Sequence, residues 1–224
     1  MICPVFTQTI PFSAVNRREI LRYAGVKMLT PEISRLLEES LDQALPVISG
    51  KVCWTRFPLA ENQGILDLTF AQTESEALKR NLDGCDEILV FGATIGLSLD
   101  RMILRYGQTS PSKALMLQAI GTERIENLCD AFCEICRQEA AHSGQYTVPR
   151  FSPGYGDFPL ELQKDIFRVL DCSRKIGLTL NDSMMMSPSK SVTAIVGLRR
   201  CPGSSGASGC HSCTKTDCIY RRTP

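Results

Sequence analysis

The sequence lacks an excess of charge of either sign. It has 25 Lys and Arg residues against 24 Asp and Glu, a net charge of +1. No run of basic residues indicates nucleic-acid binding, and no acidic tail indicates a basic partner. The N-terminus has no charged segment followed by a long apolar stretch, and no apolar run approaches the ~18 residues of a membrane-spanning helix. We therefore expect a soluble protein of the cytoplasm that binds neither nucleic acid nor membrane.

Cysteine, by contrast, is abundant, with 11 residues in a chain of 224. Without a secretory signal these residues point to free thiols or metal ligands rather than disulfides. The composition is otherwise that of a folded protein, with 43% hydrophobic and 22% charged residues. The length allows one large domain or two small ones.

The hydrophobic pattern predicts a mixture of helices and strands. We expect strands 51–57 and 65–71 to pair as an antiparallel hairpin across the link 58–64. Gly92–Gly96 lacks the residues of a phosphate-binding loop and predicts a tight turn. The predicted helices cover residues 31–45, 73 onward, 97–106, 111–121, 122–141 and 159–177, and the other predicted strands cover 87–91 and 191–198.

A shift in composition near Arg199 separates residues 1–198 from a tail, 199–224, that is rich in Gly, Ser and Cys. The tail places Cys201, Cys210, Cys213 and Cys218 within 18 residues. Four thiolates on a flexible segment can surround a zinc ion or an iron–sulfur cluster. The alternative interpretation is a set of free thiols.

A second group of cysteines, Cys129, Cys133 and Cys136, has the spacing of the cluster-binding motif of radical S-adenosylmethionine enzymes. Here, however, the three residues lie within a predicted helix without an intervening Gly or Pro. A helix distributes these side chains over more than one direction, so it cannot gather three sulfurs around one cluster. We interpret these cysteines as core residues.

The segment Arg150-Phe151-Ser152-Pro153-Gly154-Tyr155 has the chemistry of a ligand-binding loop. Arg150 offers a planar guanidinium to a carboxylate, and Tyr155 offers a ring face to a cation. Pro153 stiffens the chain, while Gly154 permits close approach of the backbone. These groups suit S-adenosylmethionine, which carries a carboxylate and a sulfonium. Taken alone, the segment could equally be a simple turn.

Three further features flank this loop along the chain. Asp130-Ala131-Phe132 precedes the loop on a helix, and Ser183-Met184-Met185-Met186-Ser187-Pro188 and Ser191-Val192 follow it. From about residue 127 to 198 this arrangement resembles the activation domain of cobalamin-dependent methionine synthase, in its small stand-alone version. The resemblance implies an α+β fold with a curved antiparallel sheet and packed helices. It divides residues 1–198 into an N-terminal helical and hairpin part, 1–110, and a ligand-binding part, 111–198.

The resemblance also implies a function. Such a domain binds S-adenosylmethionine and supports reductive methylation of cob(II)alamin to methylcobalamin, as the activation component of a methyltransferase system. The cobalamin is then held by a partner, because the sequence lacks an Asp-x-His-x-x-Gly motif. The expected partners are a methionine synthase without its own activation domain or another corrinoid methyltransferase, with an electron donor such as flavodoxin or ferredoxin.

Carried over by position, the resemblance assigns no catalytic residue but a set of ligand contacts. Arg150 would hold the ligand and Asp130 its ammonium group. The full expected set is Asp130, Arg150, Phe151, Pro153, Gly154, Tyr155, Ser187 and Pro188.

The sequence departs from the family after residue 198, where the family has another strand with a ligand-contacting tyrosine. Here the cysteine-rich tail follows instead. We hypothesise that a cluster on Cys201, Cys210, Cys213 and Cys218 supplies the electron for cobalt(II), or that a structural zinc replaces the missing strand. The alternative function is an iron–sulfur or zinc protein of electron transfer or regulation that does not bind S-adenosylmethionine.

Overall fold

The computed structural model describes residues 3–201 and is built around a five-stranded antiparallel sheet. The strands follow one another across the sheet in the order β1-β2-β6-β10-β7. Their bounds are β1 Phe6–Thr9, β2 Lys51–Pro58, β6 Glu87–Thr94, β10 Ser191–Arg199 and β7 Tyr146–Thr147. Both predicted parts of the chain therefore contribute strands to one sheet. The division into these parts stays a prediction.

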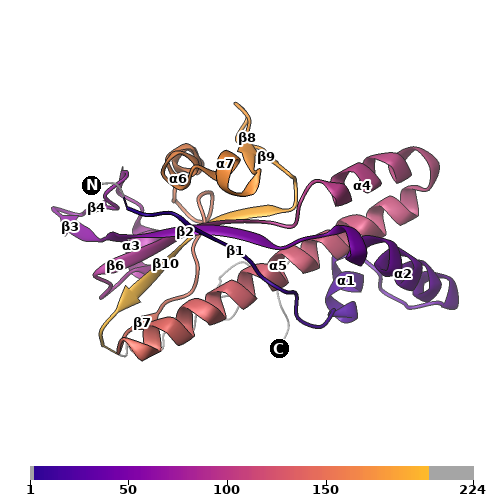
Figure 1. Ribbon diagram of the computed structural model, residues 1–224, viewed down its shortest axis with the longest axis horizontal. Helices are drawn as coiled ribbons and strands as arrows, with labels where there is room; N and C mark the ends of the chain where they lie inside the picture. Colours follow the sequence, from indigo (N-terminus) through magenta and orange to yellow (C-terminus); the bar gives the residue numbers. More distant parts are fainter. Residues whose placement is uncertain (1–2, 202–224) are drawn as a thin grey trace.

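Helices cover both faces of the sheet (Figure 1). The long helix α5, Pro111–His142, runs along one face, and α6, Gln163–Leu170, and α7, Cys172–Ile176, cover the other. Three helices gather around the first half of α5: α1 Arg17–Tyr23, α2 Pro31–Ala44 and α4 Ser98–Thr109. The remaining elements are β3 Ala60–Asn62, β4 Ile65–Asp67, β5 Gln72–Thr73, α3 Glu76–Asn81, β8 Thr179–Leu180, β9 Met186–Ser187 and the 3-10 helices Leu45–Val47 and Leu160–Leu162.

Burial of both faces explains why the central strands are almost continuously apolar. In β10, Ala194, Val196 and Leu198 belong to the core beneath α5, while Ile195 belongs to the core beneath α6 and α7. The sheet therefore separates two hydrophobic cores. The architecture confirms the predicted fold class, a curved antiparallel sheet with packed helices.

Several predicted elements are confirmed, among them α2, β2 and β10. The start of α2 follows from Thr30, whose hydroxyl accepts a hydrogen bond from the Ile33 N–H at 3.4 Å, and from Pro31 in the first turn. In the part of the chain that the structure describes, no helix combines the length and apolarity needed to cross a membrane.

The predicted hairpin between strands 51–57 and 65–71 is wrong. Strand β2 pairs with β1 and β6, whereas β4 pairs with β3 and β5 in a separate three-stranded sheet. The residues assigned to the link supply strand β3 themselves. Gln63 and Gly64 both have positive φ, 51° and 81°, and this two-residue turn joins β3 directly to β4.

Two glycines that predicted chain breaks instead permit close packing. Strand β6 runs through Gly92, where an added Cβ would lie 3.2 Å from Cys172 Sγ of α7. Residues 111–141, predicted as two helices, form the single helix α5, and a Cβ on Gly121 would lie 2.6 Å from Leu99 Cδ2 of α4. The predicted helix 159–177 is in turn divided at Asp171, which has φ 49°.

Candidate functional site

The predicted ligand-binding loop begins where the chain leaves the edge of the sheet. Val148 N–H donates to Gly197 O at 2.9 Å, and Phe151 and Ile195 exchange two backbone hydrogen bonds of 2.8 Å. After Phe151 the chain turns away. Within residues 3–201, no strand pairs with β10 at Ser191–Thr193 on this side, so that stretch of the sheet edge stays open.

A groove with a volume of about 480 Å³ lies along this open edge. Its walls come from α5, the loop, the start of α6, β9 and β10. The lining residues are Glu126, Arg150, Ser152, Pro153, Gly154, Tyr155, Leu160, Gln163, Met186, Ser191, Val192 and Thr193. Four of the predicted ligand contacts, Arg150, Pro153, Gly154 and Tyr155, therefore line one groove.

A charged cluster occupies the α5 side of the groove. Arg150 donates from Nη2 to Glu126 Oε2 at 2.7 Å and from Nη1 to Asp130 Oδ1 at 2.5 Å. The side chains of Arg150, Glu126 and Asp130 are 22%, 33% and 53% exposed. Burial acts to lower the pKa of Arg150, but the neighbouring acidic groups raise it above its ordinary value, so the guanidinium stays charged.

Glu126 was not predicted as a site residue, although it lies four residues before Asp130 and hence on the same face of α5. It lines the groove, whereas Asp130 lies beside the groove and lines a neighbouring depression of about 270 Å³ that Glu126 also borders. The structure therefore brings Asp130 to Arg150 but places a second carboxylate, Glu126, in the wall of the groove.

The loop itself presents a ring to the groove. Tyr155 is 62% exposed, and its ring meets the Phe151 ring edge-on with centroids 6.1 Å apart. Phe151 also packs near Phe158, at 6.2 Å, on the core side of the loop. Gly154 has φ 89°, a conformation that favours glycine, and its N–H donates to Phe158 O at 2.8 Å. Phe151 thus supports the loop, while Tyr155 faces the groove.

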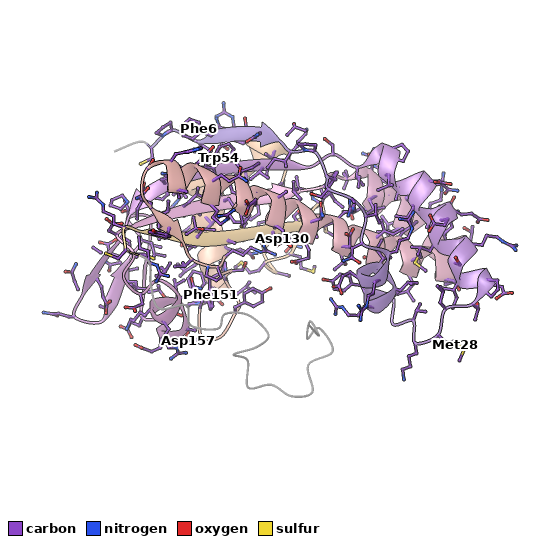
Figure 2. All side chains as sticks on the ribbon, turned by 90° about the horizontal axis from the view of Figure 1, so that it is seen from below. Phe6, Met28, Trp54, Asp130, Phe151 and Asp157 are labelled. Atoms are coloured by element: carbon purple, nitrogen blue, oxygen red, sulfur yellow. The ribbon has the colours of Figure 1, made fainter. Side chains whose placement is uncertain are left out.

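The far end of the loop is held by Asp157. Its carboxylate accepts hydrogen bonds from Ser75 Oγ at 2.5 Å, Glu76 N–H at 2.9 Å and Ala77 N–H at 3.0 Å, at the N-terminus of α3. These hydrogen bonds, first among them that of Ser75, lower the pKa of Asp157 to about 2. Sequence reasoning missed this residue. Figure 2 labels Asp130 on α5, Phe151 at the start of the loop and Asp157 near its end.

Ser187 and Pro188 lie next to the groove rather than in its wall, where their neighbours Met186 and Ser191 are found. The peptide bond between them is cis. The following residues are attached to the body of the protein: Ser189 N–H and Oγ both donate to Asp100 at 2.7 Å, and Ser191 Oγ lies 2.7 Å from Pro188 O and 2.8 Å from Thr94 Oγ1. These contacts fix the start of β10 as one wall of the groove.

The cysteines of α5 pack in the interior. Cys129 and Cys136 are buried and Cys133 is partly buried. Burial raises the pKa of the Cys129 and Cys133 thiols, and it raises that of Cys136 to about 12. Cys201 is exposed, and Cys210, Cys213 and Cys218 lie outside the described residues. Among residues 3–201, no group of three or more His, Cys, Asp or Glu side chains is arranged to hold a metal ion.

Comparison with known proteins identifies relatives of this arrangement. Residues 78–200, more than half of the 224, match the family model described as the activation domain of vitamin B12 dependent methionine synthase. A search of curated proteins gave no match. Among solved structures, the MetH reactivation domain bound to AdoHcy superposes with a TM-score of 0.58 at 17% identity, over 87% of this chain and 78% of that one. At this identity the structural match shows a shared fold.

Proposed function

Because the chain belongs to the activation-domain family of vitamin B12-dependent methionine synthase, we propose that it binds S-adenosylmethionine in the groove along β10. Its role would be to present the methyl group for reductive methylation of cob(II)alamin on a cobalamin-dependent methyltransferase. The solved domain of the same fold is bound to AdoHcy, the product that S-adenosylmethionine leaves after methyl transfer, and this supports the choice of ligand.

The observation that carries the proposal is the charged cluster at the mouth of the groove. One guanidinium and two carboxylates give Arg150, Glu126 and Asp130 a net charge of −1. S-adenosylmethionine has one carboxylate, one ammonium and one sulfonium, so its net charge is the opposite. Arg150 would bind the ligand carboxylate, and Glu126 and Asp130 would share its ammonium, so each charge exchanges one partner for another without being left unpaired.

The loop would then position the sulfonium. A cation over the face of a tyrosine gains about 0.5–2 kcal/mol, depending on how far it is removed from water. Tyr155 lines the groove, with the Phe151 ring edge-on to it. Pro153 and Gly154 bring the backbone to the ligand, and Pro188, whose carbonyl accepts a hydrogen bond from Ser191 Oγ at 2.7 Å, holds the opposite wall in place.

The proposed methylation needs one electron and one methyl group. One electron from a donor such as flavodoxin or ferredoxin reduces the cobalt(II) substrate held by the partner. The methyl group then passes from the sulfonium to cobalt, so that the carbon–sulfur bond breaks, a cobalt–carbon bond forms and AdoHcy remains. This chain would bind and orient the sulfonium compound. Its partners would hold the cobalamin and supply the electron.

Calorimetry with S-adenosylmethionine tests the binding step. Arg150→Ala removes a charged hydrogen-bond donor, a loss of about 2–3 kcal/mol, so binding should weaken by roughly 30- to 150-fold. Arg137→Ala is the matched control, since Arg137 likewise pairs with an acid of α5, Glu134, at 2.5 Å, but it is 60% exposed and lies outside the groove. The absence of binding heat from the wild-type protein would contradict the proposal.

The methylation step is tested with the cobalt(II) form of a candidate corrinoid partner and a chemical reductant. Methylcobalamin should be recovered in the presence of the wild-type chain and S-adenosylmethionine, but not when either is omitted. Equal recovery without the chain would show that it is not the activation component for that partner.

The tail supports a second candidate, an iron–sulfur or zinc protein of electron transfer or regulation. It rests on four cysteines within 18 residues, three of which lie outside the described part of the chain. This function predicts stoichiometric iron or zinc in anaerobically purified protein together with no binding of S-adenosylmethionine. Iron and ligand binding in the same preparation would favour a cluster that serves the methylation, whereas colourless protein with zinc and no iron would exclude a cluster.

A further inference from the structure

The end of the groove away from the charged cluster contains a buried amide. Gln163, the first residue of α6, is 5% exposed and lines the groove. Its Nε2 donates to Thr193 Oγ1 at 3.5 Å, and its Oε1 has no hydrogen-bond partner among the described residues. A buried carbonyl oxygen without a donor is costly, so its presence beside a groove points to a donor on the bound ligand.

The register of the sheet edge separates this amide from the charges. Phe151 lies opposite Ile195, so Arg150 is level with Val196, three residues and about 10 Å along β10 from Thr193. In an antiparallel ladder the direction of the backbone groups alternates, so N–H and C=O of Thr193 point to the same side as those of Ile195, toward the open edge. This end of the groove thus offers several polar groups, and its lining residues Leu160, Gln163, Met186, Val192 and Thr193 carry no charge.

The walls around Gln163 suit a flat, mostly apolar group. Leu160, Met186 and Val192 line the groove together with Gln163 and Thr193. A ring between apolar side chains buries its faces, and a buried amide at its edge determines orientation. Because the amino-acid part of the ligand would occupy the Arg150 end, the nucleoside part is what reaches this end.

We infer that Gln163, held by Thr193, determines specificity for the nucleobase by accepting a hydrogen bond from the exocyclic amino group of adenine on Oε1. The inference rests on the proposed function, since it assigns the second half of the same groove. A site built around a hydrogen bond rejects a ligand that lacks the donor, because the buried acceptor is then left unpaired. Gln163 would therefore distinguish adenine from a purine that lacks the amino group.

The experiment compares AdoHcy with its analogue carrying hydrogen in place of the 6-amino group, by calorimetry on the full chain. The wild-type protein should bind the analogue about tenfold more weakly than AdoHcy. Gln163→Met, which keeps the size of the side chain and removes the amide, should bind both compounds equally. Gln138→Met is the matched control, because Gln138 is an exposed glutamine on α5, and it should keep the tenfold preference.

Thermal unfolding without ligand separates specificity from a structural role. Replacing an amide whose buried Oε1 lacks a partner by an apolar side chain should leave the midpoint of Gln163→Met unchanged or higher, even though its selectivity is lost. An unchanged preference for AdoHcy in Gln163→Met would overturn the inference. The inference would also be overturned if Gln163→Met lost selectivity together with a lower unfolding midpoint, while Gln163→Leu, which also lacks the amide, kept the selectivity.

A third ligand distinguishes the ribose from the base. Suppose that the wild-type protein binds the 2′-deoxy analogue more weakly than AdoHcy, binds the analogue without the amino group as tightly as AdoHcy, and loses this difference in Gln163→Met. In that case the amide contacts the ribose and the inference is wrong. The failure of the proposed function has a different signature, since a wild-type protein that binds none of the three compounds contradicts both proposals.

Discussion

The two ends of the loop between Arg150 and Phe158 are attached to the protein in different ways. Arg150 is held by the charges of Glu126 and Asp130 on α5, at 2.7 and 2.5 Å. Asp157 is held by a hydroxyl and two backbone N–H groups at the start of α3. The first attachment joins side chains of opposite charge, and the second joins a carboxylate to donors at the start of a helix.

This difference indicates which end is available to a ligand. A zwitterionic ligand can replace side-chain partners at Arg150 with its own carboxylate and ammonium, without leaving a charge unpaired. The donors at Asp157 have no such substitute, because two of them belong to the first turn of α3 and would otherwise lack a partner. We therefore interpret the Arg150 end as the binding end and the Asp157 end as the anchor.

After Arg150→Ala, the largest expected effect comes from the acidic partners of Arg150. Glu126→Gln should weaken S-adenosylmethionine binding about tenfold, whereas Asp130→Asn should weaken it about threefold. Glu126 lines the groove and is 33% exposed, while Asp130 is 53% exposed, so solvent screens its charge more strongly. Calorimetry at low and high salt measures the affinity of both variants for S-adenosylmethionine and how far salt screens each charge.

The matched control for this pair is Glu134→Gln, which alters an exposed acid on α5 that pairs with Arg137, and it should bind like wild type. A larger loss at Asp130 than at Glu126 would restore the assignment made from sequence, in which Asp130 alone holds the ammonium. Equal binding by all three variants would remove the charged cluster from the site.

The contrast between these two acids shows what the sequence could and could not predict. The loop motif was found from its residue types, and Asp130 was assigned through the family resemblance. Glu126 could have been found too, because a carboxylate one helical turn from Asp130 shares its face. What the sequence did not contain is the bridge between Phe151 and Ile195, which places Arg150 beside that face of α5.

Packing between distant segments also explains the errors in the fold. Gly92 and Gly121 were read as chain breaks because glycine is common at turns. Their local conformation is in fact regular, and the glycines serve contacts with Cys172 and Leu99, which come from other parts of the chain. Gln163 was missed for the same reason, since it appears in sequence only as a polar residue at the start of an amphipathic helix.

The anchoring end should have a smaller effect on binding. Asp157→Ala removes the acceptor for Ser75, Glu76 and Ala77, so part of the binding energy must order the loop. We expect S-adenosylmethionine binding about threefold weaker, with a lower midpoint of thermal unfolding. Asp42→Ala, at an exposed acid on α2, is the control and should change neither quantity. A loss as large as that of Arg150→Ala would mean that Asp157 contacts the ligand.

The smallest expected effect is the pH dependence, near neutral pH, of the stabilisation that the Asp157 carboxylate provides. Its pKa is lowered to about 2 by the hydrogen bond from Ser75 and by those of the α3 backbone, against about 3.9 in an unfolded chain. For a lowered pKa the stabilisation is fully present above the unfolded value and is lost as pH falls toward the folded one. The difference in unfolding midpoint between wild type and Asp157→Ala should therefore stay constant from pH 8 to about 5.

Below that range the difference should close between about pH 4 and 2, because protonated Asp157 no longer accepts all three hydrogen bonds. Thermal scans across this series measure it directly. A difference that already closes between pH 7 and 5 would show that Asp157 is not held as a carboxylate by α3. Because both end attachments lie within one loop, such a result would also remove the reason for treating Arg150 as the exchangeable end and Asp157 as the fixed one.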